Sequence, residues 1–384
     1  MKLPAVAIVR GKFLNRYEMQ TFEPLTSRYR ITAFGSLTPM HEAFAFPVIK
    51  LPSPMDLPDV PYKMPIINRV WTDAQYLYGL EDALRGFDLV HTAETYFRYT
   101  QQCLNAKKRG RVRSVVATVW ETIPHNNEGI RGRLAYKARA RRELDHIIAV
   151  TEKAKAALVS EGTDPRKISV IGAHIDTARF APEKGWLTHL ADPKRRLFTI
   201  LFCGRLVSEK GVPDILAAAP NIISEAVRRG FRIQWVFVGS GPWQQVLANQ
   251  NRVIGKNWHS TVESATYDQM PRLYREADIF LAPSTSTKTW EEQYGMALLE
   301  AQASGLPIVT TRCGGIPENV GDAAIVVPPS DPDAIAREII SFLITPKKRG
   351  MYAARARKRA VSRHDIRVGA RAVARVYERV LFSR

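Results

Sequence analysis

A strand followed by a glycine turn and a helix is the feature that most constrains the fold of this chain. The apolar run 198–203 ends at Gly204, and a helical pattern begins at Val212. A further apolar run, 233–238, also ends at a glycine, Gly239, where backbone can approach a ligand, although this exit alone fits a plain turn. Because such units bring the carboxyl ends of parallel strands to one edge of a sheet, the pattern predicts a doubly wound α/β fold.

Two glutamates eight residues apart follow a further apolar run. The run 277–282 predicts a buried strand, its exit loop contains Glu292, and a helix that begins at Met296 carries Glu300. The N–H groups at a helix start attract an anion by about 0.3–2 kcal/mol, so the amides near Gly295 can hold a phosphate. Glu300 can then accept hydrogen bonds from two ribose hydroxyls. Two glutamates beside a helix also fit a plain solvated face.

Two cations stand in the loop after the run 198–203. The guanidinium of Arg205 can grip a diphosphate, and the ammonium of Lys210 can add a point charge. Hydrogen bonds to charged groups are worth about 1.5–3 kcal/mol each, so this pair can dominate the binding of a nucleoside diphosphate. The alternative is an ordinary strand exit with surface cations.

These strand exits occur in order, and the strand 307–311 then leads into the sequence GGIPE at 314–318. Over residues 146–380 this arrangement resembles the donor domain of glycosyltransferase family 4, which comprises retaining group 1 enzymes of the GT-B fold. That fold has two Rossmann-like doubly wound domains facing a central cleft, and a C-terminal helix that crosses back to the N-terminal domain.

The resemblance implies roles for single residues on the donor side. Arg205 and Lys210 would bind the diphosphate of a nucleotide sugar and stabilise it as it departs. Glu300 would bind the ribose, and Glu292 would orient the transferred sugar or stabilise its developing charge. The residues expected beside them are Tyr294, Gly295, Met296 and Gly239.

A length of 384 residues is too great for one typical core and suits two domains. A hydrophobic content of 45% and a charged content of 24% are those of an ordinary globular protein. With the resemblance, we expect an acceptor-binding domain over residues 1–183, a donor-binding domain over 184–362, and a returning C-terminal helix over 363–384.

The N-terminal half carries weaker signals for the acceptor side. Gly11 stands where the family has a glycine-rich loop, and His91 lies near the end of an apolar run. A lone histidine at a strand end is also common as a structural residue. Trp120 occupies a position where many relatives have a histidine that contacts the sugar. We expect that contact either from Glu121 or His125, or from Trp120 by stacking on a sugar face.

The reaction implied by the resemblance is transfer of a hexosyl group from a UDP- or GDP-sugar to an acceptor hydroxyl with retention of configuration. The acceptor would be a glycan or lipid-linked precursor. A phosphate oxygen of the leaving group takes the proton in this family, so no protein base, obligatory metal or other cofactor is expected. A GT-B nucleotide-sugar epimerase and a non-catalytic GT-B scaffold are the alternatives. Product analysis separates the first from a transferase, and turnover separates the second.

The cysteine content and the apolar runs bear on the cellular compartment. The chain has only three cysteines, none in a metal-ligand or paired spacing, which favours a reducing compartment. The N-terminal apolar run is too short for a signal peptide, and no run approaches the roughly 18 residues needed to span a bilayer. We expect a cytoplasmic protein, either free or peripheral on the inner face of the cell membrane.

The net charge of +19 is unevenly distributed along the chain. Residues 1–185 carry +9, residues 186–346 carry −1, and residues 347–384 carry +11. One stripe of arginines recurs every four residues along a predicted C-terminal helix: Arg363, Arg367, Arg371, Arg375 and Arg379. With further cations between residues 107 and 142, this stripe would form either a docking face for anionic lipid or a plain solvated face. Nucleic acid is not expected as a partner, because few aromatic residues interleave these cations.

Overall fold

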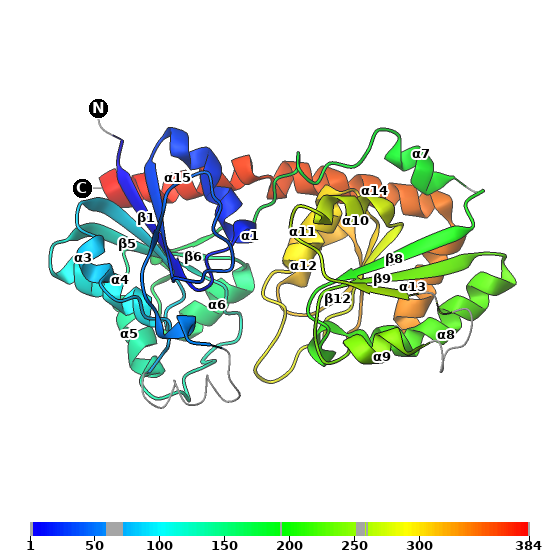
Figure 1. Cartoon of the computed structure of the whole chain (residues 1–384), viewed down its shortest axis with the longest axis horizontal. Helices are drawn as coiled ribbons and strands as arrows, with labels where there is room; N and C mark the ends of the chain where they lie inside the picture. Colours follow the sequence, from blue (N-terminus) through cyan, green and yellow to red (C-terminus); the bar gives the residue numbers. More distant parts are fainter. Residues whose placement is uncertain (1–2, 59–71, 193, 251–257, 259, 383–384) are drawn as a thin grey trace. The chain divides into compact units, whose positions relative to one another are not determined.

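The computed structural model describes residues 3–58, 72–192, 194–250, 258 and 260–382. The chain divides into two compact units, each built around its own sheet (Figure 1). Unit 1 comprises Met1–His174 with Ile366–Arg384, and unit 2 comprises Ile175–Asp365. The division therefore falls after His174 rather than after residue 183, and Ile366 rather than residue 363 begins the returning segment.

Unit 1 is built on a seven-stranded sheet with parallel pairing in the order β3-β2-β1-β4-β5-β6-β7. Its strands are β1 (Ala5–Gly11), β2 (Arg30–Gly35), β3 (Val48–Lys50), β4 (Phe87–Ala93), β5 (Val112–Val119), β6 (His146–Ala149) and β7 (Ile168–Val170). The strand order reverses between β1 and β4, since the chain first adds strands on one side of β1 and then on the other. In doubly wound sheets, ligands bind at the carboxyl ends of the strands at such a reversal.

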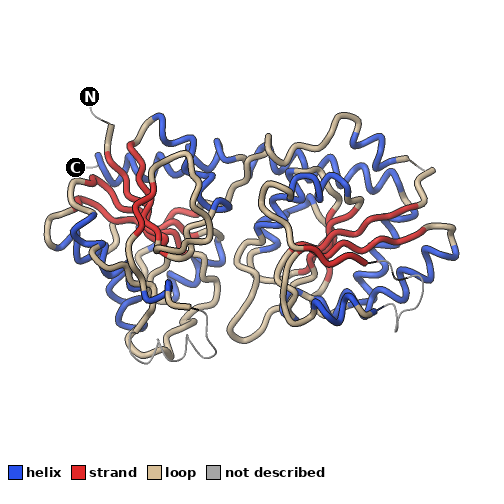
Figure 2. The backbone as a smooth tube through the Cα atoms, viewed as in Figure 1, coloured by secondary structure: helices blue, strands red, loops and turns tan. Residues whose placement is uncertain are grey.

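The helices of unit 1 lie on either side of its sheet (Figure 2). They are α1 (Arg16–Met19), η1 (Gln20–Ser27), η2 (Pro54–Asp56), α3 (Leu80–Ala83), α4 (Arg98–Lys108), α5 (Arg133–Glu143), α6 (Glu152–Ser160), η3 (Pro165–Lys167) and α15 (Ile366–Phe382). The last of these, α15, buries Val373, Tyr377 and Leu381 in the same core as Ile8 and Phe22. This confirms the predicted return of the C-terminal helix to the N-terminal domain.

Unit 2 is built on a six-stranded sheet with parallel pairing in the order β10-β9-β8-β11-β12-β13. Its strands are β8 (Leu197–Cys203), β9 (Arg232–Val238), β10 (Ser260–Glu263), β11 (Ile279–Ala282), β12 (Ile308–Thr311) and β13 (Ile325–Val327). The predicted strands in this half are confirmed, with ends shifted by at most two residues. Here the strand order reverses between β8 and β11.

The longer helices of unit 2 pack apolar residues into the core around this sheet. They are α7 (Trp186–Ala191), η4 (Ser208–Lys210), α8 (Val212–Arg228), α9 (Gln244–Ala248), α10 (Met270–Glu276), α11 (Met296–Ala303), α12 (Ile316–Val320), η6 (Gly321–Ala323), α13 (Pro332–Ile344), α14 (Pro346–Arg359) and the π-helical turn η7 (Ala360–His364). In α8, Ile215 and Ile222 recur at helical spacing and pack in the core with Phe198 and Ile200 of β8. Across the described ranges of both units, no helix combines the length and apolar character that a membrane span requires.

Candidate active site

The loops after β8 and β11 place charged residues at the strand reversal of unit 2. Arg205 and Lys210 follow β8, and Glu292 follows β11. Because β8 and β11 are adjacent parallel strands, their carboxyl ends bring these loops to the same edge of the sheet. The structure thus gathers three residues that the sequence separates by up to 87 positions.

Lys210 and Glu292 form an ion pair at this edge. The Nζ atom of Lys210 lies 2.5 Å from Oε2 of Glu292, and the Ser284 hydroxyl donates to the same oxygen at 3.3 Å. The Lys210 ammonium also lies 5.3 Å from the centre of the Trp290 ring. The sequence predicted both charged residues but not their pairing, which places a cation and an anion side by side in the candidate site.

Arg205 occupies the exposed side of the loop after β8. Its guanidinium can therefore meet an anion from solvent, while the half-buried Lys210 sits deeper beside Glu292. The planar guanidinium of Arg205 and the compact ammonium of Lys210 stand on one loop. Together they suit the two phosphates of a nucleoside diphosphate.

Glycines let the strand exits of unit 2 approach one another backbone to backbone. Gly239, directly after β9, has a φ of +141°, and a Cβ added there would lie 2.0 Å from the carbonyl oxygen of Gly204. A Cβ on Gly314 would likewise lie 2.0 Å from the carbonyl oxygen of Glu292. The N–H of Gly315 donates to that same oxygen at 2.8 Å. Side chains at these glycines would displace the loops that carry the charged residues.

The start of α11 is fixed by a buried asparagine. The side-chain amide of Asn319 donates to the carbonyl oxygens of Tyr294, at 2.7 Å, and Gly295, at 3.1 Å. Gly295 has a φ of +84° and precedes Met296, the first residue of the helix. The side chain of Tyr294 is buried. The predicted loop-to-helix junction is therefore confirmed.

Glu300 lies on α11 and is 5% exposed. The Tyr274 hydroxyl of α10 donates a hydrogen bond to Oε2 of Glu300 at 2.8 Å. Burial raises the pKa of Glu300 to about 7, while the Tyr274 hydrogen bond and the charge of Arg179 act in the opposite direction. No signal in the sequence pointed to Tyr274, because no spacing relates a residue of α10 to one of α11.

The carboxyl edge of the sheet in unit 1 carries the expected acceptor-side residues. Gly11 ends β1 with a φ of +55°, next to the side chains of Gln75 and Tyr99. His91 lies on β4 and is fully buried. Its Nδ1 atom lies 2.7 Å from the Tyr377 hydroxyl. Its Nε2 atom lies 2.7 Å from the Thr118 hydroxyl, so both ring nitrogens are already bonded within unit 1.

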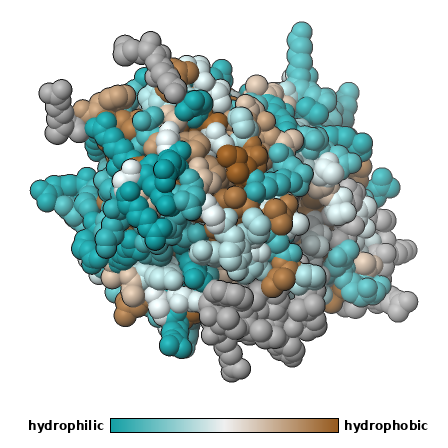
Figure 3. All heavy atoms as spheres, turned by 60° about the vertical axis from the view of Figure 1, so that its left-hand side comes forward, coloured by the Kyte–Doolittle hydropathy of each residue, from teal (hydrophilic) through white to brown (hydrophobic). Residues whose placement is uncertain are grey.

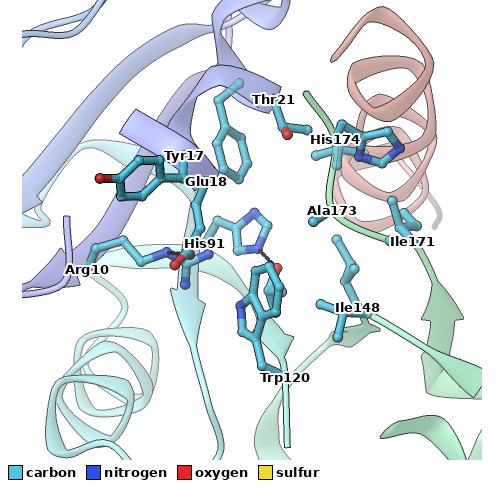
Figure 4. Close-up of a pocket in the computed structure, with 15 residues that line it drawn as sticks. Arg10, Tyr17, Glu18, Thr21, His91, Trp120, Ile148, Ile171, Ala173 and His174 are labelled. Carbon is cyan, nitrogen blue, oxygen red and sulfur yellow. Dashed lines mark hydrogen bonds and ion pairs between the residues drawn. The ribbon is translucent and has the colours of Figure 1, made fainter. Parts of the chain in front are cut away.

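A small cavity lies beside His91 and Trp120. Figure 4 shows both rings at this cavity, with Arg10 and Glu18 on another side of it. The Arg10 guanidinium is buried and lies 3.2 Å from the Glu18 carboxylate. The cavity volume is about 40 Å³, which is room for about one water molecule and not for a sugar ring. Burial and the Arg10 charge lower the pKa of His91 well below its ordinary value, so His91 is neutral.

Glu121 and His125 belong to a turn rather than to this cavity. The Glu121 carboxylate accepts hydrogen bonds from the backbone N–H of Ile123 at 2.9 Å and the side chain of Asn126 at 2.7 Å. His125 is exposed, and its Nδ1 atom lies 3.0 Å from a Glu128 oxygen. Of the three candidates for the sugar contact, only Trp120 lines the cavity.

Glu94 is a further candidate for the site that the sequence interpretation missed. It directly follows β4, beside the strand reversal of unit 1, and has a φ of +56° although it is not glycine. It is 4% exposed, and its Oε1 accepts the N–H of Trp120 at 2.8 Å. Burial, reinforced by Glu121, raises the pKa of Glu94 to about 8. Its position as a charged residue at the end of an apolar run was the available signal.

No metal-binding cluster is formed by the residues whose placement is described, since nowhere among them do three His, Cys, Asp or Glu side chains gather suitably.

Two Rossmann-like units, each with charged residues at its strand reversal, define a protein of the GT-B class. The sequence matches the family model "Glycosyl transferases group 1" over residues 198–344 and the model "Glycosyltransferase Family 4" over residues 31–179. The chain therefore belongs to the group 1 glycosyltransferases of family 4.

Named relatives and solved structures agree with this assignment. The chain is 28% identical over 290 residues to a D-inositol 3-phosphate glycosyltransferase of Segniliparus rotundus, a match that covers 73% of this chain and 58% of the relative. It is 31% identical over 223 residues to one of the phosphatidylinositol N-acetylglucosaminyltransferase polypeptides of Arabidopsis thaliana, covering 55% and 45%. The matches thus span about half the length of these relatives.

Among solved structures, Anabaena HepE in complex with UDP aligns with a TM-score of 0.74 and 16% identity, covering 98% of this chain and all of that chain. The sucrose-phosphate synthase of Thermosynechococcus elongatus aligns with a TM-score of 0.73 and 16% identity, covering 98% and 99%. At these identities the likeness concerns the fold.

Proposed function

We propose that this chain is a retaining glycosyltransferase that moves a hexosyl group from a UDP- or GDP-sugar to an acceptor hydroxyl. The observation that carries the proposal is the group of Arg205, Lys210 and Glu292 at the strand reversal of unit 2, followed by Glu300 on the next helix. These residues offer cations for a diphosphate and carboxylates for the hydroxyls of a ribose and a sugar.

The Lys210–Glu292 pair matches the charges that develop in glycosyl transfer. As the bond between sugar and diphosphate lengthens, negative charge grows on the diphosphate and positive charge grows on the sugar ring. Lys210 and Arg205 stabilise the first of these charges, and Glu292 stabilises the second. Because the pair is already in place at 2.5 Å, little reorganisation is needed when the charges appear.

The acceptor proton needs no protein base in this scheme. The acceptor attacks on the face that the diphosphate vacates, and a phosphate oxygen of the leaving group takes the proton. Arg205 and Lys210 also supply the positive charge that a bound metal would otherwise provide. We therefore expect transfer to proceed without an obligatory divalent cation, and an absolute requirement for Mg²⁺ or Mn²⁺ would contradict this scheme.

The names of related proteins support a nucleotide-sugar donor. Anabaena HepE was solved with UDP, with UDP and glucose, and with UDP-glucose. The names of the two relatives above refer to inositol 3-phosphate and to phosphatidylinositol. For this chain we infer a glycan or lipid-linked acceptor at the cytoplasmic face of a membrane, in keeping with its basic α15.

The test is the thermal shift of the protein with UDP, GDP, ADP and their sugar conjugates. A ligand that binds only the folded state raises its stability by about 2.7 kcal/mol at 100 times its Kd. We expect one nucleotide to raise the Tm of the wild type and not that of Glu300→Ala. Glu276→Ala, which removes an exposed glutamate of α10 in the same unit, is the matched control and should respond like the wild type.

Analysis of the products then separates the transferase from its alternatives. Release of nucleoside diphosphate together with a retained anomeric configuration in the glycosylated acceptor supports the proposal. Free epimer formed without any acceptor would indicate an epimerase instead. Stabilisation by no nucleotide at all would contradict donor binding and favour a non-catalytic scaffold.

A further inference from the structure

The buried surroundings of Glu300 include a phenol that the reaction scheme does not use. Tyr274 lies on α10 and is fully buried, with its ring packed against Phe180 and Phe280 at centroid distances of 5.9 and 5.6 Å. Aromatic packing on two sides fixes the ring, and therefore also fixes the hydroxyl at its tip. That hydroxyl lies 2.8 Å from Oε2 of Glu300 and 3.3 Å from the carbonyl oxygen of Ala297.

The Tyr274 hydroxyl has one proton, and the carboxylate is its nearer and more strongly accepting partner. This bond occupies Oε2 and fixes the rotation of the Glu300 carboxyl group. Among the hydrogen bonds seen between described residues, none engages Oε1. A carboxylate held at one oxygen presents the other in a constant direction, as recognition of a hydroxyl group requires.

We propose that Tyr274 is a positioning residue for nucleotide binding, which holds the Glu300 carboxyl group oriented toward the hydroxyls of the donor ribose. The proposal rests on the proposed function, because it takes Glu300 as the ribose ligand. It adds a residue on a different helix, α10, whose contribution is made through Glu300 and not by touching the nucleotide.

The protonation state of Glu300 gives this role a distinctive signature. The groups that face Glu300 are the Tyr274 phenol, the half-buried Cys203 thiol at the end of β8, and the Arg179 guanidinium. Burial raises the pKa of Glu300 to about 7, and the Tyr274 hydrogen bond works against that rise. Loss of the phenol hydroxyl therefore raises the pKa further, so that more of the carboxyl group is protonated and neutral near pH 7.

A neutral carboxyl group accepts hydroxyl hydrogen bonds less well than a carboxylate does. Tyr274→Phe should therefore bind nucleotide weakly at neutral pH and recover as rising pH ionises Glu300. A variant that had merely loosened the packing would instead be weak at every pH. This difference separates positioning from a general structural defect.

The experiment measures the Kd of UDP, GDP and ADP by calorimetry between pH 6 and 9, for the wild type and for Tyr274→Phe. We expect about tenfold weaker binding by Tyr274→Phe at pH 7, and a difference of about twofold or less at pH 9. Tyr352→Phe is the matched control, because Tyr352 lies on α14 in the same unit and its ring packs against Phe342 of α13. It should follow the wild type at every pH.

A second measurement keeps the test valid if Tyr274→Phe does not fold. Site-specific replacement of Tyr274 by 3-fluorotyrosine leaves the shape nearly unchanged and makes the hydroxyl a stronger donor. The midpoint of the affinity profile should then move to lower pH. Equal affinities and midpoints for wild type and variants would overturn the role of Tyr274 while nucleotide binding stands. Failure of the wild type to bind any of the three nucleotides would instead overturn the proposed function, and this inference with it.

Discussion

At the scale of single residues, Lys210 should contribute most to the rate of transfer. Its ammonium contacts Glu292 and belongs to the loop expected to meet the diphosphate. Lys210→Ala removes the charge that stabilises the leaving group, and it leaves the Glu292 carboxylate without its ion-pair partner. We expect kcat to fall by roughly 100-fold or more, with a smaller change in KM, because the interaction strengthens as the transition state forms. The rate of nucleoside diphosphate release at saturating donor and acceptor measures kcat.

The matched control is Lys348→Ala in the same unit. Lys348 also forms an ion pair, at 2.8 Å from Glu338, but on helices α13 and α14 outside the candidate site. Its removal should change kcat by no more than about twofold, because neither residue of this half-buried pair belongs to the candidate site. A Lys210→Ala variant that kept more than half of the wild-type kcat would contradict the assigned role.

The sequence pointed to single site residues where the signal came from their neighbours along the chain. Glu292 and Glu300 could be singled out because they follow one strand at a fixed spacing, and Arg205 and Lys210 because they share a loop. Glu94 offered one local signal, its position at the end of an apolar run, but its φ of +56° and its burial depend on neighbouring strands. The Tyr274 bond to Glu300 joins separate helices, and no sequence period relates them.

At the scale of elements, the return of α15 to unit 1 gives His91 a hydrogen-bond partner. Tyr377 of α15 contacts Nδ1 of His91 on β4, across 286 positions of the chain. Tyr377→Phe would leave that buried ring nitrogen without its partner. We expect the free energy of unfolding to fall by about 1–3 kcal/mol, the usual cost of an unsatisfied buried polar group. Urea denaturation at pH 7.5 would measure the loss.

Tyr78→Phe in the same unit provides the comparison, because Tyr78 is 49% exposed. Its unfolding free energy should stay within about 0.5 kcal/mol of the wild type. Equal stabilities of the two variants would show that the His91–Tyr377 hydrogen bond contributes nothing to the fold. A role of His91 as a contact for the acceptor would then be the better interpretation.

The strands and helices were largely predictable from the sequence, but the contacts between distant ones were not. Apolar runs that end in glycine or a polar loop predicted β8, β9 and β11 nearly to the residue, because a buried parallel strand needs apolar residues on both faces. The sequence also showed the amphipathic pattern of α15. It did not show that the Tyr377 hydroxyl would contact Nδ1 of His91. Contacts between distant elements form only when the core is assembled.

At the scale of the whole molecule, the positive charge is concentrated in unit 1 and the C-terminal segment. The donor-side segment 186–346 is nearly neutral, whereas residues 1–185 and 347–384 together carry the excess. The described part of α15 exposes Arg367, Arg371, Arg375 and Arg379 on one side, opposite the buried Val373 and Tyr377. On the face drawn in Figure 3, hydrophilic side chains predominate and hydrophobic ones form small separate patches. We expect any attachment to an anionic membrane to depend on the charge of these four arginines.

Each basic side chain near an anionic bilayer contributes about 1 kcal/mol, so the four arginines of α15 would supply most of the five or six charges that reversible binding needs. Replacing all four by glutamine should abolish co-sedimentation with vesicles that contain phosphatidylglycerol, and salt should weaken wild-type binding, because surface charges are screened.

The matched control replaces four exposed arginines of unit 2 by glutamine: Arg228, Arg229, Arg232 and Arg337. It lowers the net charge equally and should retain binding. Equal losses in both variants would show that net charge alone acts, and wild-type binding indifferent to anionic lipid would leave α15 as a solvated face.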